Sequence, residues 1–447
     1  MGTTLQMKPH QRDAEKVKDF QRKIYFKAKQ DKDYRFYVLY DKMRMGHFLR
    51  ESYRRVKRKG GAPGSDGVTF AEIEAEGIEG FIDGIIKELE NGTYKPQVVK
   101  RIYILNPNGK LRPIGIPTIR DRVVQMSCKL VIEPIFEADF EDSSYGFRPK
   151  RDAKGAMPRL KKELKGGKTE VYEADLSNYF DTIPHDKLLI TVGKRISDKR
   201  VLKLLKLWLK TPVIDEENRI SGGKKAKTGT PQGGVISPLL ANIYLHLLDK
   251  VVNKPGSVYS QEGVCIIRFA DDFVLMGKRI TTTVQQKTES ILTRMGLELN
   301  REKTKVVKAR EKSFDFLGFT IRYDRDLQGR NWKYWNIIPA ERGNRKIRKA
   351  IKEVYCYGLN NSPDKLVKRL NEKIRGWINY YTVPGVTYPG GAKRKLYWYL
   401  SDSLQRYYRR KSQRRSKLYR RGAFGILVKN YGLINPSNYQ PKTLANA

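Results

Sequence analysis

The sequence predicts an α+β fold with a separate, basic helical part near its carboxyl end. Apolar, β-prone stretches alternate with helical patterns from about residue 98 to FDFLGFTIRY (Phe314 to Tyr323). Residues 341–421 then become helical and very basic, with aromatic side chains at helical spacing. A strand-rich middle followed by helices is typical of an α+β chain that carries a helical domain. We therefore expect a domain boundary near residues 330–340.

The first third of the chain predicts helices followed by one hairpin. Residues 11–58 have the periodicity of helices of mixed charge, and GGAPGSDG (Gly60 to Gly67) breaks the chain into a loop. Residues 71–90 have the pattern of an amphipathic helix. Residues 98–118 predict two strands around a turn at Asn106 to Gly109, because apolar runs flank turn-forming residues.

The middle of the chain alternates helices and strands. A half-buried helix is expected over 119–138, and a loop that opens another helix over 144–156. Strands and hairpins are expected at 171–175, 213–228, 265–276 and 314–323. Helices are expected from about His185, over 235–250 and over 281–296.

Charge and cysteine content restrict the classes of partner and compartment. The chain has 90 Lys and Arg against 48 Asp and Glu, a formal net charge of +42. Lys and Arg displace the counterions condensed on phosphates, so nucleic acid is the expected partner. An anionic membrane surface is the competing explanation, but the sequence has no apolar run of 18 residues and no apolar signal segment. Three scattered cysteines without a C-x-x-C pair exclude a zinc ribbon and fit a reducing cytoplasm.

Two acidic segments predict the chemistry. Asp175 follows an apolar strand pattern in EADLSNYFDTIPH, and Asp271 and Asp272 lie at an expected hairpin bend in RFADDFVL. Carboxylates in apolar, β-prone runs are costly to bury unless they are paired or bind a metal. One carboxylate on one strand and two on a neighbouring bend can hold two divalent cations. Two such cations about 4 Å apart stabilise the attacking and leaving oxygens of phosphoryl transfer, which is polymerase chemistry.

These segments, in this order, resemble a bacterial group II intron-encoded reverse transcriptase and maturase of the type that lacks an endonuclease. The resemblance runs from about residue 20 to residue 435. It rests on an N-terminal extension (RKIYFKAKQDKDYRFYVLYDK), a series of polymerase blocks, a maturase signature (LNEKIRGWINYY) and a basic tail. The polymerase blocks are GGAPGSDGV, LRPIGIPTIRDRVVQ, SYGFRPKRDA, DLSNYFDTIPH, GTPQGGVISPLLANIYL, RFADDFVL, LNREKTKV and FDFLGF.

The resemblance implies a right-hand polymerase architecture. The expected parts are a basic helical extension over 1–58, fingers over 59–157, a catalytic palm over 158–335, a helical thumb or maturase domain over 336–405 and a basic tail over 406–447. It also implies two Mg²⁺ ions, with Mn²⁺ as an alternative, because Mg²⁺ prefers hard oxygen ligands together with substrate phosphates. Asp175 and Asp271 would bridge both ions, Asp272 would be an outer ligand, and the Leu176 carbonyl would complete one coordination sphere.

The resemblance assigns further residues to the nucleotide. Phe180 is the expected steric gate against a 2′-hydroxyl, although the neighbouring Tyr179 could be confused with it. The cations expected at the triphosphate are Arg112, Lys110, Arg101 and Lys303. Gln232 is expected to lie near the nascent base pair. Many relatives have Ile-Pro-Lys-Pro where this chain has Ile-Leu-Asn-Pro ending at Pro107. Either Lys110 compensates for the uncharged Asn106, or triphosphate binding is weaker.

Other residues are expected to hold the primer and the RNA. Leu317, Gly318 and Phe319 resemble the primer grip, whereas Trp377, Tyr380 and Tyr381 have the spacing of a helical core. Basic residues near aromatic side chains favour nucleic-acid contact. The expected contacts are Arg148, Lys373, Arg375, Arg409, Arg410, Arg414 and Arg415.

The expected function is RNA-templated DNA synthesis together with binding of a group II intron RNA, whose splicing and mobility by reverse transcription (retrohoming) the protein would assist. The expected partners are intron RNA, an RNA template, a DNA primer, target DNA and dNTPs, with no membrane. A second hypothesis is a related reverse transcriptase that has left its intron and serves phage defence, a CRISPR locus or DNA repair. Folding of the flanking DNA into a group II RNA would separate the two. A third is a splicing factor with a vestigial polymerase, against which the intact aspartates argue.

Overall fold

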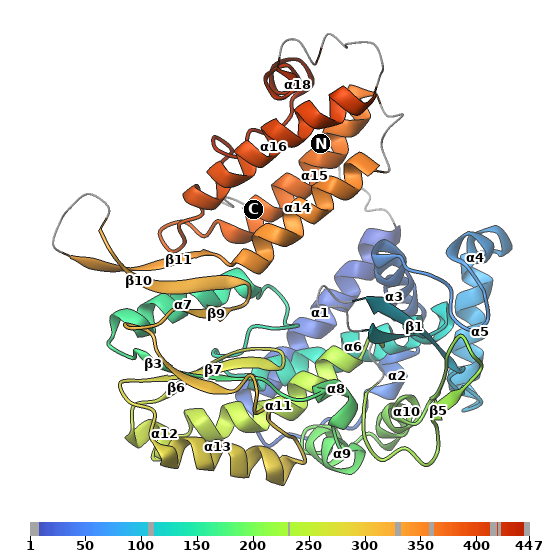
Figure 1. Ribbon diagram of the computed structural model, residues 1–447. Helices are drawn as coiled ribbons and strands as arrows, with labels where there is room; N and C mark the ends of the chain where they lie inside the picture. Colours follow the sequence, from blue (N-terminus) through green and yellow to red (C-terminus); the bar gives the residue numbers. More distant parts are fainter. Residues whose placement is uncertain are drawn as a thin grey trace, which may run out of the picture.

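The computed structural model describes residues 9–105, 111–230, 233–326, 332–356, 362–411, 418 and 422–441. Figure 1 shows a broad body that contains the sheets and, above it, a bundle of long helices. The α+β prediction is confirmed, with strands concentrated between residues 99 and 339. No helix within these ranges is both long and apolar enough to cross a membrane.

The amino-terminal part is helical, as predicted. Its helices are α1 (Pro9–Gln30), α2 (Tyr40–Met43), α3 (Gly46–Lys59), α4 (Phe70–Glu76) and α5 (Ile78–Glu90). The prediction of one continuous helix over 71–90 is wrong, because Gly77 lies between α4 and α5 with a φ of 105°. That backbone conformation is accessible to glycine and ends the first helix.

A four-stranded sheet follows, with the order β2-β1-β4-β5. Its strands are β1 (Val99–Leu105), β2 (Leu111–Ile116), β4 (Pro212–Ile214) and β5 (Ile220–Gly222). β1 and β2 form the predicted hairpin, in which Arg101 lies opposite Gly115 and Arg112 lies opposite Ile104. The turn expected at Asn106 to Gly109 lies outside the described residues.

Helix α6 (Ile119–Asp139) begins at Thr118, whose hydroxyl accepts a hydrogen bond from the Asp121 amide. It packs against α1, α2 and α3 and is buried on nearly every side, more deeply than the predicted half burial. A helix enclosed in this way is apolar around most of its circumference rather than along one stripe. It forms the centre of the amino-terminal core.

A second sheet, with the order β6-β7-β3-β8, is antiparallel throughout. Its strands are β3 (Glu170–Ala174), β6 (Cys265–Phe269), β7 (Asp272–Gly277) and β8 (Lys305–Lys308). The helices around it are α7 (Ala153–Lys165), α8 (Tyr179–Thr182), α9 (His185–Gly193), α10 (Lys199–Leu209), α11 (Ser237–Asn253), α12 (Val258–Gln261) and α13 (Thr282–Met295).

This central sheet is buried on both faces, because successive side chains of a strand point to opposite sides. Tyr172 and Phe273 join the core cluster that contains α6, whereas Val171, Val274 and Met276 join a second cluster. The second cluster continues through α7 into the helical bundle as far as Leu433. One layer of strands therefore separates the two cores.

The remaining strands are β9 (Phe314–Phe316), β10 (Phe319–Arg325) and β11 (Lys333–Pro339), in the order β11-β10-β9. The prediction of one strand over Phe314 to Tyr323 is wrong. Leu317 and Gly318, with φ values of 50° and 78°, form a tight turn between β9 and β10. A single glycine in a segment rich in aromatic and β-branched residues was compatible with one continuous strand, so the sequence did not mark this turn.

The bundle consists of α14 (Glu341–Cys356), α15 (Pro363–Tyr381), α16 (Gly390–Lys411) and α18 (Ala423–Tyr431). The change from strands to helices falls between Pro339 and Glu341, near the expected boundary. Lys161 of α7 ties the body to the bundle, since its ammonium donates to the carbonyls of Gly385 and Val386 at 3.0 Å each. The predicted domain limits remain a prediction.

Candidate active site

The ends of β3 and β7 bring the three aspartates to one edge of the central sheet. Ala174 pairs with Phe273, so Asp175 follows β3 beside Asp272, the first residue of β7. Phe269 pairs with Asp272, which leaves Ala270 and Asp271 as the two-residue turn of the β6–β7 hairpin. The strand pairing therefore joins two segments that lie far apart in the sequence, as predicted.

The surroundings of these aspartates make it unfavourable for all three side chains to be ionised at the same time. Burial and then the charge of Asp175 raise the pKa of Asp271, although Arg112 and Arg268 act in the opposite direction. Burial and then the charges of Asp271 and Asp175 raise the pKa of Asp272 to about 7. The Asp272 side chain is exposed to solvent, which screens part of this repulsion. A cation at this edge would relieve the repulsion.

Lys303 forms an ion pair with the Asp175 carboxylate. Its Nζ atom is 2.8 Å from Asp175 Oδ2, and the Asn300 amide donates to the Asp175 carbonyl at 2.8 Å. Over the described ranges, no three His, Cys, Asp or Glu side chains are close enough together to hold a metal ion as they stand. A cation that binds Asp175 would therefore compete with the Lys303 ammonium. The Leu176 side chain is buried, and its backbone pairs with Leu299.

The structure distinguishes the two candidates for the gate. Tyr179 is buried, and its hydroxyl donates to the Ala241 carbonyl at 2.6 Å. Phe180 is only half-buried, and its ring lies 6.3 Å from that of the exposed Phe147. Tyr179 is therefore a core residue, and Phe180 is the ring that can face a substrate.

The two arginines of the β1–β2 hairpin do not lie together. Paired residues share a face of a hairpin and neighbours alternate, so Arg101 and Arg112 point to opposite faces. Arg112 is exposed and acts electrostatically on Asp271, although burial dominates the upward shift of that pKa. Arg101 lines a pocket of about 350 Å³ with Asp181 and Thr230. The two arginines therefore reach different sides of the hairpin, and the role of Arg101 at the triphosphate stays a prediction. Lys110 and Gln232 lie outside the described residues.

The glycine-rich loop packs tightly between the hairpin and α8. A Cβ atom on Gly233, whose φ is 111°, would overlap the Gly115 carbonyl oxygen. On the other side, the Thr230 amide donates to the Phe180 carbonyl at 2.7 Å. Only glycine allows so close an approach, so Gly233 lies directly against the hairpin while Thr230 is bonded to Phe180.

The β9–β10 turn, predicted as the primer grip, is held by the bundle. The Tyr380 hydroxyl donates to the Leu317 carbonyl at 2.8 Å, and the Ala340 amide donates to the Gly318 carbonyl at 2.9 Å. The rings of Tyr380 and Phe319 stack with centroids 5.7 Å apart. Burial raises the pKa of Tyr380, and the charges of Asp152 and Asp272 add to this effect. Helical spacing indicated a core position for Tyr380, but its side chain is partly exposed on the side of the aspartates.

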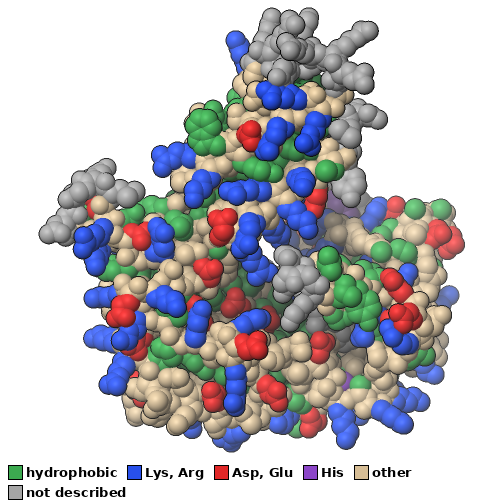
Figure 2. Space-filling view, viewed as in Figure 1, with side chains coloured by type: hydrophobic (Ala, Val, Ile, Leu, Met, Phe, Trp, Pro, Cys, Tyr) green, Lys and Arg blue, Asp and Glu red, His purple; other side chains and the backbone are tan. Residues whose placement is uncertain are grey.

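The basic residues expected to contact nucleic acid divide into two groups. Lys373, Arg375, Arg409 and Arg410 are exposed on α15 and α16, and Figure 2 shows many Lys and Arg side chains on the visible face of the bundle. Arg414 and Arg415 lie outside the described residues. The expectation that Arg148 contacts nucleic acid is wrong. Its guanidinium is buried against Glu137 and donates to the carbonyls of Glu141 and Ser144 at 2.6 and 2.8 Å. It holds the 141–148 loop instead of facing solvent.

A second buried arginine, Arg268, was missed by the sequence reasoning. It lies two residues before Ala270 and pairs with Asp249 of α11, and both side chains are 0% exposed. Because acidic residues follow Arg268 closely in a very basic chain, the sequence does not show that its side chain is buried. Its partner comes from a helix earlier in the chain.

Two family models match the chain in succession. Residues 104–321 match "Reverse transcriptase (RNA-dependent DNA polymerase)", and residues 344–423 match "Group II intron, maturase-specific domain". The first range contains all three aspartates and the Leu317–Gly318 turn. The second covers most of the helical bundle.

Curated relatives agree with these matches. The Escherichia coli protein YkfC is 34% identical over 362 residues, which cover 73% of this chain and 93% of YkfC. The Lactococcus lactis group II intron-encoded protein LtrA is 42% identical over 172 residues, 38% of this chain and 28% of LtrA. The Saccharomyces cerevisiae putative COX1/OXI3 intron 2 protein is 31% identical over 402 residues, 75% of this chain and 46% of that protein. The chain thus spans less than half the length of the latter two.

Among solved structures, the chain is similar to one titled "Partial Cas6-RT-Cas1--Cas2 complex", with 21% identity, a TM-score of 0.36 and coverage of 57% of this chain and 41% of that one. The two family models and the similarity to nearly the whole of YkfC decide the classification. The chain belongs to the group II intron-type family of reverse transcriptases and maturases.

Proposed function

We propose that this chain is an RNA-directed DNA polymerase that also binds a group II intron RNA as a maturase and assists its splicing and mobility. The observation that carries the proposal is the edge of the central sheet, to which the pairing of β3, β6 and β7 brings Asp175, Asp271 and Asp272. This edge lies within the matched reverse transcriptase range, and the matched maturase range follows it.

The carboxylate edge suits divalent cations. Its three side chains supply hard oxygen ligands, and burial together with their mutual repulsion raises the pKa of Asp271 and of Asp272. Asp175 and Asp271, with Asp272 as an outer ligand, would hold two Mg²⁺ ions. When bound, such ions stabilise the attacking and leaving oxygens of phosphoryl transfer.

The surrounding side chains would select and orient the nucleotide. Phe180 would place its ring against the sugar, where a 2′-hydroxyl would clash. Arg112 would neutralise the triphosphate from the side of the hairpin that faces Asp271. The Lys303 ammonium, now 2.8 Å from Asp175, would become available to the departing pyrophosphate once a cation occupies that carboxylate. The half-buried ring of Phe180 and the exposed charges of Arg112 and Lys303 support these roles.

The maturase role is supported by the exposed basic residues of the bundle, which include Lys373, Arg375, Arg409 and Arg410. Structured RNA is recognised mainly through its backbone, its shape and its 2′-hydroxyls, so basic surfaces can bind it without reading bases. The proposed partners are intron RNA, an RNA template, a DNA primer, target DNA and dNTPs.

Primer extension on an RNA template with dNTPs and Mg²⁺ tests the polymerase. We expect extension by the wild type, loss of extension in Asp271→Asn and unchanged RNA affinity, because the change removes a metal ligand and no basic surface. Asp83→Asn, at an exposed position of α5, is the matched control and should extend normally. Extension by Asp271→Asn at the wild-type rate would refute the metal assignment.

A further inference from the structure

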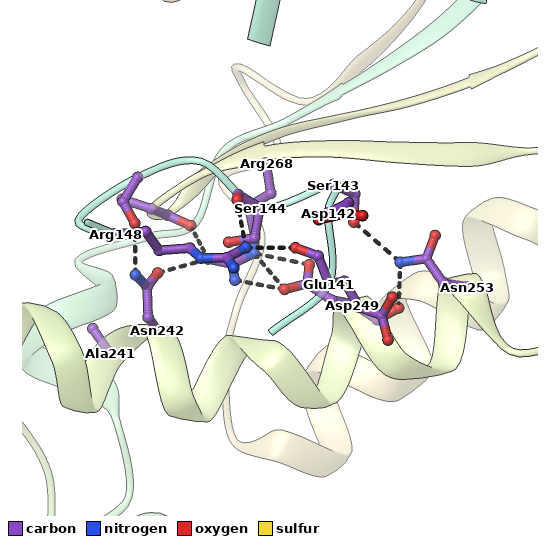
Figure 3. Close-up of polar contacts among 12 residues, drawn as sticks. Glu141, Asp142, Ser143, Ser144, Arg148, Ala241, Asn242, Asp249, Asn253 and Arg268 are labelled. Carbon is purple, nitrogen blue, oxygen red and sulfur yellow. Dashed lines mark hydrogen bonds and ion pairs between the residues drawn. The ribbon is translucent and has the colours of Figure 1, made fainter. Parts of the chain in front are cut away.

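A buried ion pair lies directly beneath the turn that carries Asp271. Arg268 Nε is 2.9 Å from Asp249 Oδ1, and its Nη2 atom is 2.5 Å from Asp249 Oδ2. Both side chains are 0% exposed. Figure 3 shows the guanidinium lying above α11, with Asp249 on one side and Asn242 on the other.

The remaining donor of this guanidinium reaches the turn itself. Arg268 Nη1 donates to Asn242 Oδ1 at 3.0 Å and to the Ala270 carbonyl at 2.8 Å. Asn242 Nδ2 in turn donates to the Gly146 carbonyl at 2.6 Å. The guanidinium therefore links α11, the aspartate turn and the loop before α7.

The turn needs such support because Ala270 has a φ of 58°, a region that residues with a Cβ atom rarely adopt. A Cβ atom on Gly146 would overlap the Ala270 nitrogen, so the 144–148 loop packs directly against the turn. Ala270 therefore contacts both Gly146 and the Arg268 guanidinium. The next residue is Asp271.

A buried ion pair is weak evidence for stability, because desolvation cancels most of its attraction. What arginine supplies here is a planar set of donors that reaches Asp249, Asn242 and Ala270 at once. We propose that Arg268, fixed by Asp249 and Asn242, is a positioning residue that orients the Ala270–Asp271 peptide and thereby the Asp271 carboxylate for metal binding. This inference rests on the proposed polymerase function.

The test compares two buried arginines. Arg268→Lys keeps a positive charge, but its single ammonium nitrogen cannot take the places of Nε, Nη1 and Nη2 together, so it cannot keep the bonds to Asp249 along with those to Asn242 and Ala270. The matched control is Arg195→Lys, since Arg195 is also buried, lies 3.0 Å from Asp139 and donates to the Ala28 carbonyl at 2.8 Å. The double variant Arg268→Met/Asp249→Leu removes both charges, a replacement that folded proteins often tolerate.

Three properties are measured for each variant: the melting temperature, the primer–template Kd and the Mg²⁺ dependence of kcat. We expect Arg268→Lys and the double variant to lose about 10- to 100-fold in kcat or in apparent Mg²⁺ affinity, with an unchanged primer–template Kd. Arg195→Lys should lower the melting temperature without changing the Mg²⁺ dependence. Wild-type Mg²⁺ dependence in folded Arg268 variants, or an equal defect in Arg195→Lys, would overturn the inference.

A second readout separates this inference from the polymerase proposal. The increase in melting temperature on addition of Mn²⁺, without primer or dNTPs, reports metal binding directly. We expect this increase in the wild type and its loss in Asp271→Asn and Arg268→Lys. If the wild type shows the increase but no primer extension, the polymerase proposal fails while the loss in Arg268→Lys still supports positioning. An undiminished increase in Arg268→Lys contradicts positioning whatever the activity.

Discussion

At the scale of single residues, the aspartates that we propose as metal ligands also destabilise the metal-free fold, because their negative charges repel one another. Burial and the charges of Asp271 and Asp175 raise the pKa of Asp272 to about 7, so its ionised form is disfavoured in the folded protein without a cation. The sequence predicted that these aspartates lie at the ends of apolar strands, and the pairing of β3 with β7 places those strand ends at one edge. It could not predict the pKa, which depends on the depth of the edge and on the distance between strands.

Asp272→Asn should therefore stabilise the protein in metal-free buffer. The folded-state pKa is raised, so the wild type loses stability as the pH rises from about 4 towards 7, and the loss is complete above that range. We expect the variant to be more stable by on the order of 1 kcal/mol at pH 8, after allowance for solvent screening. Urea denaturation in EDTA at pH 5 and pH 8 measures the difference. An equal stability of the two proteins at pH 8 would contradict the shifted pKa.

Phe180→Ala should admit ribonucleotides, because it removes the ring that we assign against the sugar. We expect the preference for dNTP over rNTP in kcat/KM to fall by about 10- to 100-fold. Tyr179→Phe is the control, since it removes only a buried hydroxyl that donates to the Ala241 carbonyl. Unchanged discrimination in Phe180→Ala would argue against its role as the gate.

At the scale of elements, the pairing register of the strands determines side-chain orientations that the periodicity of the sequence does not predict. The β1–β2 hairpin was predicted, but the opposite orientations of Arg101 and Arg112 follow from the pairing of Arg101 with Gly115. The Leu317–Gly318 turn was missed because a lone glycine between two aromatic residues was equally compatible with one packed strand. Arg148 and Arg268 were not predicted as buried, because their acidic partners come from other segments.

Tyr380→Phe should loosen the β9–β10 turn without unfolding the bundle. The change removes the hydroxyl that donates to the Leu317 carbonyl at 2.8 Å and leaves the stacked ring in place. A neutral hydrogen bond contributes about 1 kcal/mol, so we expect roughly a fivefold loss in the number of nucleotides added per binding event. Single-encounter primer extension measures this, with Tyr397→Phe on α16 as the control. A wild-type product length would show that the bond has no part in holding the primer.

At the scale of the whole molecule, the net charge of +42 makes RNA binding depend on salt. Lys373→Gln and Arg375→Gln should each reduce the slope of log K against log salt by about 1, if each residue contacts a phosphate. Filter binding of structured RNA over a range of KCl concentrations measures the slope. Arg148→Gln is the contrasting variant, because loss of a buried partner should lower stability and leave the slope unchanged. An equal change of slope in all three would contradict the division between exposed and buried cations.

The two-sided burial of the central sheet has a consequence for engineering and for evolution. Val171, Val274 and Met276 belong to the apolar cluster that continues through α7 and β10 into the bundle, while Tyr172 and Phe273 on the same strands complete the other core. A chain cut after Pro339 would uncover Phe319, whose ring packs against Tyr380 and Tyr381 of the bundle, and exposed apolar surface of this kind is prone to aggregation. Exchanging the bundle for that of a relative would require matching substitutions where the body contributes to this cluster. The two halves are thus constrained to change together, even where only one of them meets a new RNA.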